Sequence, residues 1–258
     1  MATDHLERVR QEFTRQAGTF AASAAIADDA LTARFVDAMG EAGRGRILDV
    51  ACGPGIVTAA LAAEAREVVA FDITPEMLRR AERRCADAGL TNVTFKEGNA
   101  THLPFPDGIF DGVVTRLSVH HFQEPRRVVD EIARVLRPGG TFVLADVVSS
   151  ENEDESALQN AIEILRDPSH TRMLPQSELL SMVEGAGFDV ASHVSWDRPR
   201  EFEEWMGIIN DATRVGPIRT VVHALAGAGR TAGMGLSLVD GGIEFFHRWI
   251  LVVARKPG

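Results

Sequence analysis

Tyrosine is absent from the 258 residues, so no reaction step of this protein can use a phenolic hydroxyl. The two cysteines, Cys52 and Cys85, are too few for a disulfide framework of the secreted type, which favours a cytoplasmic protein. No uncharged run approaches the roughly 20 residues that span a bilayer, and the N-terminus lacks a basic segment followed by an apolar one. We therefore expect neither membrane insertion nor a signal peptide.

Positive charge is also in short supply. Asp and Glu number 37 against 27 Lys and Arg, which gives a formal net charge of −10 at pH 7. A protein that binds a polyphosphate backbone gains affinity from dense basic side chains, and this chain has the opposite balance. Nucleic acid is therefore disfavoured as a partner, and a small-molecule acceptor is expected instead. The sequence does not indicate an oligomeric state.

What the chain does contain is a regular alternation of strand and helix signals. Short apolar runs predict strands at 46–51, 67–71, 92–96, 110–115 and 141–148, and further strands near 188–194 and 244–254. Apolar residues at helical spacing predict helices at 4–15, 24–39, 75–88, 124–137, 156–166, 176–184, 201–213 and 218–226, and an Ala-rich helix after residue 55. Thr74 as N-cap and Pro75 at the first helical position mark one of these helix starts.

Strands that alternate with helices across residues 46–148 indicate βαβ units, and hence a parallel sheet covered on both faces. We expect an α/β fold: a Rossmann-like, doubly wound, mostly parallel seven-stranded sheet with N-terminal helices and a helical insertion before the last strand. One domain is expected over 1–258. Its parts would be an N-terminal helical cap (1–42), a cofactor-binding core (43–150), and substrate-side helices, lid and final strands (151–258). The Gly-rich stretch 227–235 is predicted to be flexible.

The turn Cys52-Gly53-Pro54-Gly55 lies between a predicted strand and a predicted helix, where Rossmann-like folds bind their ligand. Glycines let the backbone approach a ligand closely, and the N-terminus of the following helix favours a negative group. Asp72, at the end of the next strand, can accept hydrogen bonds from ribose hydroxyls. The plain alternative is a tight structural turn with an incidental acidic residue, Asp49, before it.

Two cofactors compete for this turn. A dinucleotide needs the pattern G-x-G-x-x-G, but Thr58 occupies the place of the third glycine, and Asp49 would repel a pyrophosphate. S-adenosylmethionine instead brings an ammonium group for Asp49 and a carboxylate for the backbone amides. The residues therefore favour S-adenosylmethionine, with S-adenosylhomocysteine as product, over NAD.

Several segments carry a resemblance to a known family: ILDVACGPG, VVAFDITPEML, VTFKEGNATHLPFPDGIFD, SVHHFQEPRRVVDEIARVLRPGG and FVLADV. Over about residues 46–148 the chain resembles the class I S-adenosylmethionine-dependent methyltransferases. The match is to the small-molecule group that is similar to ubiquinone and menaquinone biosynthesis enzymes, the methyltransferase domain 11 type. A weaker similarity continues through RDPSHTRML, LLSMVEGAGFDV and the last strand.

The resemblance implies which residues surround the cofactor. Asp72 would hold the ribose, and the other positions would be Asp49, Ala51, Gly53 and Gly55 in the first turn, Ile73, Met77, Asn99 and Ala100 around the adenine, and Arg116 and Leu117 beside the methionine moiety. Two positions depart from the family pattern. The family often has Gly where this chain has Ala51, and the added methyl group should be tolerable. It usually has Asp where this chain has Asn99, whose oxygen still accepts hydrogen bonds but without charge.

His120 and Asp146 are the candidates for catalysis. His120 ends the strand-and-loop segment 110–119, and Asp146 lies at the end of the next strand. The two strands are expected to be neighbours with their C-terminal ends facing the ligand crevice, so the side chains should converge over the methyl group. The resemblance supports the pair, because sugar O-methyltransferases of this group use a His and an Asp at the matching positions as acid and base. Alternatively, one residue positions the backbone or cofactor and the other caps a helix. The remaining histidines show no metal-ligand spacing, so no metal site is expected.

These inferences point to methyl transfer to a hydroxyl, amine or activated carbon of a small, largely apolar molecule. The alternative is a protein of the same fold that binds the cofactor without transferring methyl, as a cyclase or a regulatory protein. The N-terminal helices with Phe13 and Phe20 are expected to form a lid over the acceptor pocket. The insertion at 196–242, with Phe202, Trp205 and Ile209, would complete that lid, and its Gly-rich stretch would act as the hinge.

Overall fold

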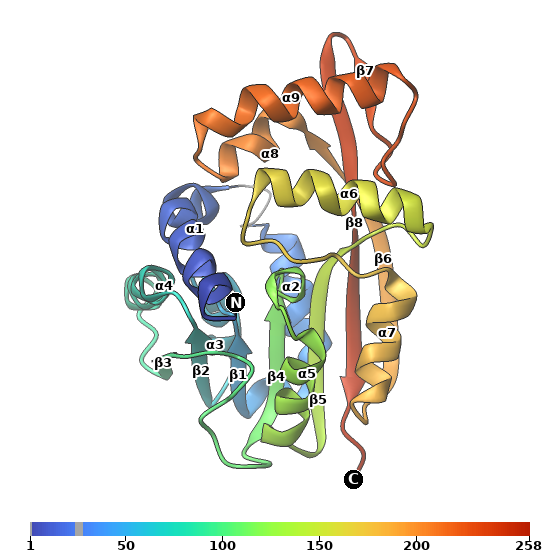
Figure 1. The fold of residues 1–258 in the computed structure, drawn as a ribbon. Coiled ribbons are helices and arrows are strands. Elements are labelled where there is room, and N and C mark those ends of the chain that lie inside the picture. The colour runs from blue at the N-terminus through green and yellow to red at the C-terminus, as the bar shows by residue number, and fades with distance from the viewer. Residues whose placement is uncertain (1, 24–27) are drawn as a thin grey trace.

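A computed structural model describes residues 2–23 and 28–258 and shows a central sheet between layers of helices (Figure 1). The strands are β1 (Arg46–Val50), β2 (Glu67–Asp72), β3 (Val93–Glu97), β4 (Phe110–Arg116), β5 (Leu136–Val148), β6 (Asp189–Glu201), β7 (Ser237–Val239) and β8 (Gly242–Arg255). The helices are α1 (Ala2–Ala22), α2 (Asp29–Met39), α3 (Ile56–Ala62), α4 (Pro75–Asp87), α5 (Pro125–Val135), α6 (Glu153–Arg166), α7 (Gln176–Gly185), α8 (Phe202–Ile208) and α9 (Ala212–Gly227), with the 3-10 turns η1 (Gly40–Arg44) and η2 (Val119–His121).

The sheet has the order β3-β2-β1-β4-β5-β8-β6. The first five strands in this order pair in parallel, and β8 lies antiparallel between β5 and β6. The predicted Rossmann-like, mostly parallel α/β fold is therefore confirmed. Within the described residues the sheet has eight strands and not seven, because β7 pairs with β8. All three residues of β7 are exposed, so no burial pattern in the sequence could have revealed it.

Each face of the sheet is covered by its own helices. Neighbouring residues of β1 point to opposite faces of the sheet. Leu48 lies in the same buried apolar cluster as Ile132 of α5, and Ile47 lies in a second cluster together with Phe35 of α2. This alternation is the period-2 geometry of a strand buried on both sides. Within the described ranges, no helix has the length and apolar character needed to cross a membrane.

The region after β5 differs from the expectation in its boundaries. The helix expected at 201–213 is two helices, because α8 ends at Ile208 and the side chain of Asp211 accepts a hydrogen bond from Thr213 N at the start of α9. β6 runs on to Glu201, well beyond the expected strand end. β6 and β8 project past the rest of the sheet, and α8, α9 and β7 gather at that end (Figure 1).

Two further expectations about helices and loops need comment. α1 extends to Ala22 and α2 begins at Asp29, whereas the start expected for the second helix, residue 24, lies outside the described residues. The Gly-rich stretch 227–235, predicted to be flexible, makes packing contacts and a hydrogen bond with the rest of the protein. Ala232 and Met234 are buried in the cluster between α6, α8 and α9, and Met234 O accepts a hydrogen bond from Phe246 N. The packing of these two side chains gives the stretch a fixed place in the structure.

Gly55 allows α3 to pack against α4. Its φ of +76° lies in the left-handed region, and a Cβ built on it would lie 2.7 Å from both Cα and Cβ of Ala81. A side chain is therefore excluded twice, by backbone conformation and by the approach of the second helix.

Gly55→Ala is expected to destabilise the protein more than Gly89→Ala does. Gly89 also has a positive φ, +70°, but a Cβ there has no neighbour within 4 Å. The control should cost about 1–2 kcal/mol for the left-handed backbone alone, and Gly55→Ala about 1–3 kcal/mol more for the clash. Denaturant unfolding measures both losses, and equal losses would contradict the packing role.

Candidate functional site

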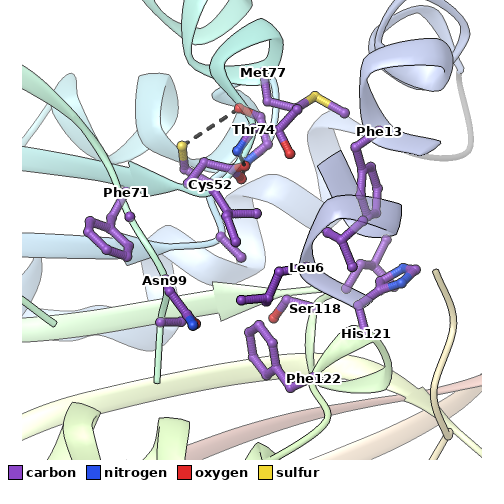
Figure 2. A pocket seen from close by; sticks show the side chains of 18 of the residues that line it. Leu6, Phe13, Cys52, Phe71, Thr74, Met77, Asn99, Ser118, His121 and Phe122 are labelled. Atoms are coloured by element: carbon purple, nitrogen blue, oxygen red, sulfur yellow. Dashed lines mark hydrogen bonds between the residues drawn. The ribbon is translucent and has the colours of Figure 1, made fainter. Parts of the chain in front are cut away.

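A cavity of about 290 Å³ lies at the C-terminal ends of β1, β2, β3 and β4, beneath α1. From the core it is lined by Asp49, Ala51, Cys52, Gly53, Pro54, Val57, Phe71, Asp72, Ile73, Thr74, Met77, Gly98, Asn99, Ala100, Thr101, Arg116, Leu117, Ser118, His121, Phe122, Gln123, Glu124 and Arg127. From α1 it is lined by His5, Leu6, Val9, Phe13 and Phe20. Figure 2 shows side chains of the core and of α1 facing one another across this space. This cavity, the larger of two adjoining ones, is thus lined by ten of the eleven residues expected around a cofactor, all but Gly55.

Asp72 organises the turn after β1. Its carboxylate accepts hydrogen bonds from Gly53 N at 2.9 Å and from Thr74 N at 2.8 Å. Burial raises the pKa of Asp72, while these backbone donors act in the opposite direction. The helix start predicted at Thr74 and Pro75 is confirmed, but the Thr74 hydroxyl does not cap it, and the Asp72 carboxylate bonds the backbone N–H of Thr74 itself.

Two non-glycine residues in the cavity wall have left-handed backbones. Ala51 has a φ of +56° and Leu117 a φ of +53°. Such conformations cost about 1 kcal/mol or more for residues that carry a Cβ, and they gather at functional sites. Alanine in place of the family's glycine at position 51 therefore costs conformational free energy of the backbone, in addition to any effect of the volume of the added methyl group.

Asp49 is a buried carboxyl group at the end of β1. Thr58 Oγ1 donates to its Oδ2 at 2.5 Å. Burial raises the pKa of Asp49 to about 7, although the Thr58 hydrogen bond and the nearby charge of Arg116 lower it. A carboxyl group poised in this way becomes fully ionised when a cation is placed beside it. The position suits an ammonium group.

The wall near β3 combines apolar side chains with one amide. Ile73, Met77 and Ala100 line it together with Asn99, whose Oδ1 accepts a hydrogen bond from Thr101 N at 3.0 Å. Figure 2 shows the amide end of Asn99 directed into the cavity, with Phe71 behind it. A flat heterocycle with polar edges would match this wall.

His120 and Asp146 are brought into contact. His120 lies in η2, after β4, and Asp146 lies on β5, with His120 Nδ1 and Asp146 Oδ1 2.5 Å apart. Asp146 also accepts from Val119 N and Val147 N, each at 2.7 Å. Burial opposes both charges, but the pair overcomes it: Asp146 raises the pKa of His120, and His120 lowers the pKa of Asp146. Because a carboxylate accepts the hydrogen bond of Nδ1–H, the free end of the imidazole is Nε2.

His120 does not line the larger cavity but a smaller one of about 70 Å³ beside it. The smaller cavity is lined by Phe13, Gln16, Phe20, Leu117, His120, His121, Val147, Glu163, Arg166, Asp167, His170, Met173, Arg200, Trp205, Ile208, His247 and Trp249. Phe13, Phe20, Leu117 and His121 line both cavities. Of the insertion residues expected in the lid, Trp205 reaches the smaller cavity, whereas Phe202 and Ile209 belong to the apolar cluster behind it.

Most polar residues of the smaller cavity carried no signal in the sequence. Glu163 and His247 are 84 positions apart and are joined by a 2.9 Å hydrogen bond. His170 lies in the segment RDPSHTRML, which carries only the weaker similarity to the family. Such residues come together through the tertiary fold, so no spacing rule could have found them. In the described residues, no group of three or more His, Cys, Asp or Glu is arranged to hold a metal ion.

Comparisons with known proteins agree on one family. The model of the family described as methyltransferase domain matches residues 48–144. A Bacillus halodurans C-125 protein assigned as a methyltransferase has a crystal structure similar to this chain, with 31% identity and a TM-score of 0.82. The match covers 88% of this chain and 99% of that one.

The methyltransferase YcgJ of Bacillus subtilis is similar to this chain in sequence and in structure. Its sequence is 34% identical over 161 residues, which are 62% of this chain and 64% of YcgJ, so the sequence match spans less than two thirds of that relative. Its crystal structure matches with 29% identity and a TM-score of 0.81 over 88% of this chain and 98% of that one. A [4+2]-cyclase, SpnF, shares the fold at 23% identity and a TM-score of 0.64, over 89% of this chain and 80% of that one.

Acidification from pH 6.5 to about 4 is expected to lower the free energy of unfolding. Burial, with a smaller effect of the charge on His120, lowers the pKa of His121 to about 4 and that of His170 to about 3, from 6.5. In this pH range the unfolded chain binds protons that the folded chain does not. Each of the two histidines therefore lowers the free energy of unfolding by up to about 1.4 kcal/mol for every pH unit of acidification.

Denaturant titrations at several pH values check this expectation. His170→Gln should make the dependence on pH shallower by about one proton. His223→Gln, an exposed substitution on α9, serves as the control and should keep the wild-type dependence. Identical pH dependences for wild type and His170→Gln would contradict the assignment of a neutral buried His170.

Proposed function

Because the chain belongs to the class I S-adenosylmethionine-dependent methyltransferases, we propose that it methylates a hydroxyl or an acidic carbon of a small molecule, with His120 as the base. The contact between His120 and Asp146 carries this proposal. An amine acceptor needs no such base once it is deprotonated, so the pair favours the first two nucleophiles.

The residues of the larger cavity fit S-adenosylmethionine. The volume of about 290 Å³ is near the lower end of the range of roughly 300–1,000 Å³ for small-molecule sites. Asp72 would hold the ribose hydroxyls and Asp49 the ammonium group. A Cβ at Gly53 would meet nothing within 4 Å, so the backbone there is open to a ligand. Met77 and Asn99 would hold the face and the edge of the adenine.

The protein's share of the chemistry is placement and proton transfer. When bound, S-adenosylmethionine supplies a methyl group on a positively charged sulfur that is already a good leaving group. The cavity walls therefore need mainly to hold the nucleophile in line with that group. Helix α1 covers this space with Phe13 and Phe20, and so excludes water that would solvate the nucleophile.

His120 would take the proton that a hydroxyl or acidic carbon loses. Its Nδ1 is held by Asp146, which fixes the tautomer and stabilises the imidazolium once the proton has arrived. Its Nε2 is then left to face the acceptor. The raised pKa of His120 strengthens it as a proton acceptor, because the Asp146 carboxylate favours the charged ring.

His120→Ala is expected to lower kcat by about 10²–10⁴ and to leave the affinity for S-adenosylmethionine unchanged. The affinity should persist because His120 does not line the larger cavity. Labelled S-adenosylmethionine with a panel of acceptors measures kcat through S-adenosylhomocysteine formation, and calorimetry measures the Kd. His193→Ala, exposed on β6, is the matched control and should behave as wild type.

The same measurements separate the alternatives. A kcat nearly unchanged in both His120→Ala and Asp146→Asn would mean catalysis by placement alone and would favour an amine acceptor. Tight cofactor binding by the wild type without any S-adenosylhomocysteine would favour a protein that binds the cofactor without transferring methyl.

A further inference from the structure

The smaller cavity has a wall of imidazole rings. The ring centroids of His120 and His121 lie 4.3 Å apart, those of His120 and His170 5.2 Å, and those of His121 and His170 6.0 Å. We propose that this cavity is the acceptor subsite and that it takes a neutral group with two or more hydroxyls, one of which is methylated. The inference rests on the proposed methyl transfer and adds the chemical class of its acceptor.

Each of the three rings is held by one nitrogen. His120 Nδ1 bonds Asp146 Oδ1 at 2.5 Å, and His121 Nδ1 bonds the carbonyl oxygen of Ser169 at 3.0 Å. His170 Nε2 lies 3.2 Å from Asn160 Oδ1. A carboxylate or carbonyl oxygen only accepts, so in every case the engaged ring nitrogen is the donor.

The Asn160 amide is oriented by its own hydrogen bonds. Its Nδ2 donates to the carbonyl oxygens of Ser156 and Met173, and its Oδ1 accepts from Met173 N. His170 must therefore donate through Nε2. Among the described residues, nothing forms a hydrogen bond with His120 Nε2, His121 Nε2 or His170 Nδ1. The wall thus offers three ring nitrogens for a ligand.

The free nitrogens of His121 and His170 accept hydrogen bonds, and so does His120 Nε2 while that ring is neutral, the form in which it can act as a base. Burial keeps His121 and His170 neutral, and whenever His120 is protonated its charge acts in the same direction. A neutral imidazole that donates through one nitrogen has a lone pair on the other. Toward these imidazoles the ligand has to bring hydrogen-bond donors, because leaving their free nitrogens unpaired in the complex would cost binding free energy.

Arg166 and Arg200 both have partners, although among the described residues Arg200 Nη2 is buried with an ion pair to Glu204 and no hydrogen bond of its own. Within the same residues, the indole nitrogens of Trp205 and Trp249 are likewise buried donors without a hydrogen-bond partner. Arg166 Nη2 donates to the carbonyl oxygen of Trp205 at 2.9 Å, and Arg200 Nε donates to Glu204 at 2.8 Å. Arg200 Nη1 also lies 3.1 Å from His247 Nδ1. Neither guanidinium stands as an isolated charge that would select an anionic acceptor.

The anions of the wall are partnered as well. Glu163 Oε1 accepts from His247 Nε2 at 2.9 Å, and Asp167 Oδ2 accepts from Gln16 Nε2 at 2.8 Å. Glu163 also pairs with Arg166, with 3.5 Å between Oε2 and Nη1, so neither Glu163 nor Asp167 is an unpartnered charge that would select an ammonium group. Hydroxyls are the donors that carry no charge, and they match this balance.

Size and position restrict the acceptor further. At about 70 Å³ the smaller cavity holds only a few non-hydrogen atoms, since one water in the liquid occupies roughly 30 Å³. Phe13 packs on His121, with ring centroids 4.8 Å apart, where the two cavities adjoin (Figure 2). A hydroxyl-bearing end would enter the smaller cavity, and any apolar remainder of the acceptor would pack against Phe13 and Phe20.

The balanced step is an O-methylation. The acceptor oxygen gains a bond to the methyl carbon, the carbon–sulfur bond breaks, and its electron pair stays on sulfur. The hydroxyl proton passes to His120 Nε2, and the positive charge formerly on sulfur remains on the imidazolium beside Asp146. A second hydroxyl donates to His121 or His170 and orients the first.

The test uses two small probes of the same skeleton. Ethylene glycol carries two hydroxyls, and 1,2-dimethoxyethane carries none. Each is titrated into the full-length protein saturated with S-adenosylhomocysteine, and the imidazole ¹⁵N resonances are followed by NMR. His121→Gln and His170→Gln assign the resonances, and exposed His193 serves as the reference.

Ethylene glycol should shift the unprotonated ring nitrogens of His121 and His170, while 1,2-dimethoxyethane and the His193 resonance show no such shift. Equal shifts with both probes, or none with ethylene glycol, would overturn the inference.

A turnover panel of neutral diols, amines and hydroxyl-free compounds separates this inference from the function beneath it. Turnover of diols, with a KM raised at least tenfold and a nearly constant kcat in His170→Gln, supports the inference. Turnover of amines or hydroxyl-free compounds alone overturns it. S-adenosylhomocysteine formed from no member of the panel, despite selective glycol shifts, would overturn the proposed methyl transfer and not the hydroxyl-binding cavity.

Discussion

The functional end of the sheet depends on the buried carboxylate of Asp146. It accepts hydrogen bonds from Val119 N and Val147 N and holds the ring of His120. A buried charge is costly unless such partners surround it, so the carboxylate fixes the path of the chain after β4. The hydrogen bonds that stabilise the buried charge of Asp146 therefore also orient His120 toward the smaller cavity. The structural role of Asp146 and its proposed role in catalysis thus rest on the same hydrogen bonds.

Helix α1 is the second constraint, because it joins the sheet core to the insertion. His5 Nε2 lies 2.9 Å from the carbonyl oxygen of His121, and Thr19 Oγ1 donates to the carbonyl oxygen of Ile208 at 2.6 Å. Between these attachments, Phe13 and Phe20 line both cavities. The helix thus brings the proposed cofactor and acceptor spaces together under one cover, which neither the core nor the insertion supplies alone.

The sequence was informative where local rules govern the structure. Apolar runs that end at turns predicted the parallel strands, and the position of Asp72 at the end of β2 predicted that its carboxylate lines the cavity. Where long-range contacts govern, it was not. The pairing of His247 with Glu163 and the exposed strand β7 have no local pattern. The left-handed backbone of Ala51 has no sequence signal either, because an alanine by itself indicates no backbone constraint.

The central claim is that cofactor and acceptor occupy adjoining cavities that meet beside His120. A crystal structure with S-adenosylhomocysteine tests it most directly. The account predicts density for the ligand in the larger cavity, with its ribose hydroxyls on Asp72 and its adenine edge at Asn99. The sulfur should lie where Phe13 and Leu117 border both cavities, and the smaller cavity should be left to the acceptor. Density for S-adenosylhomocysteine in the smaller cavity, or a ribose away from Asp72, would contradict the account.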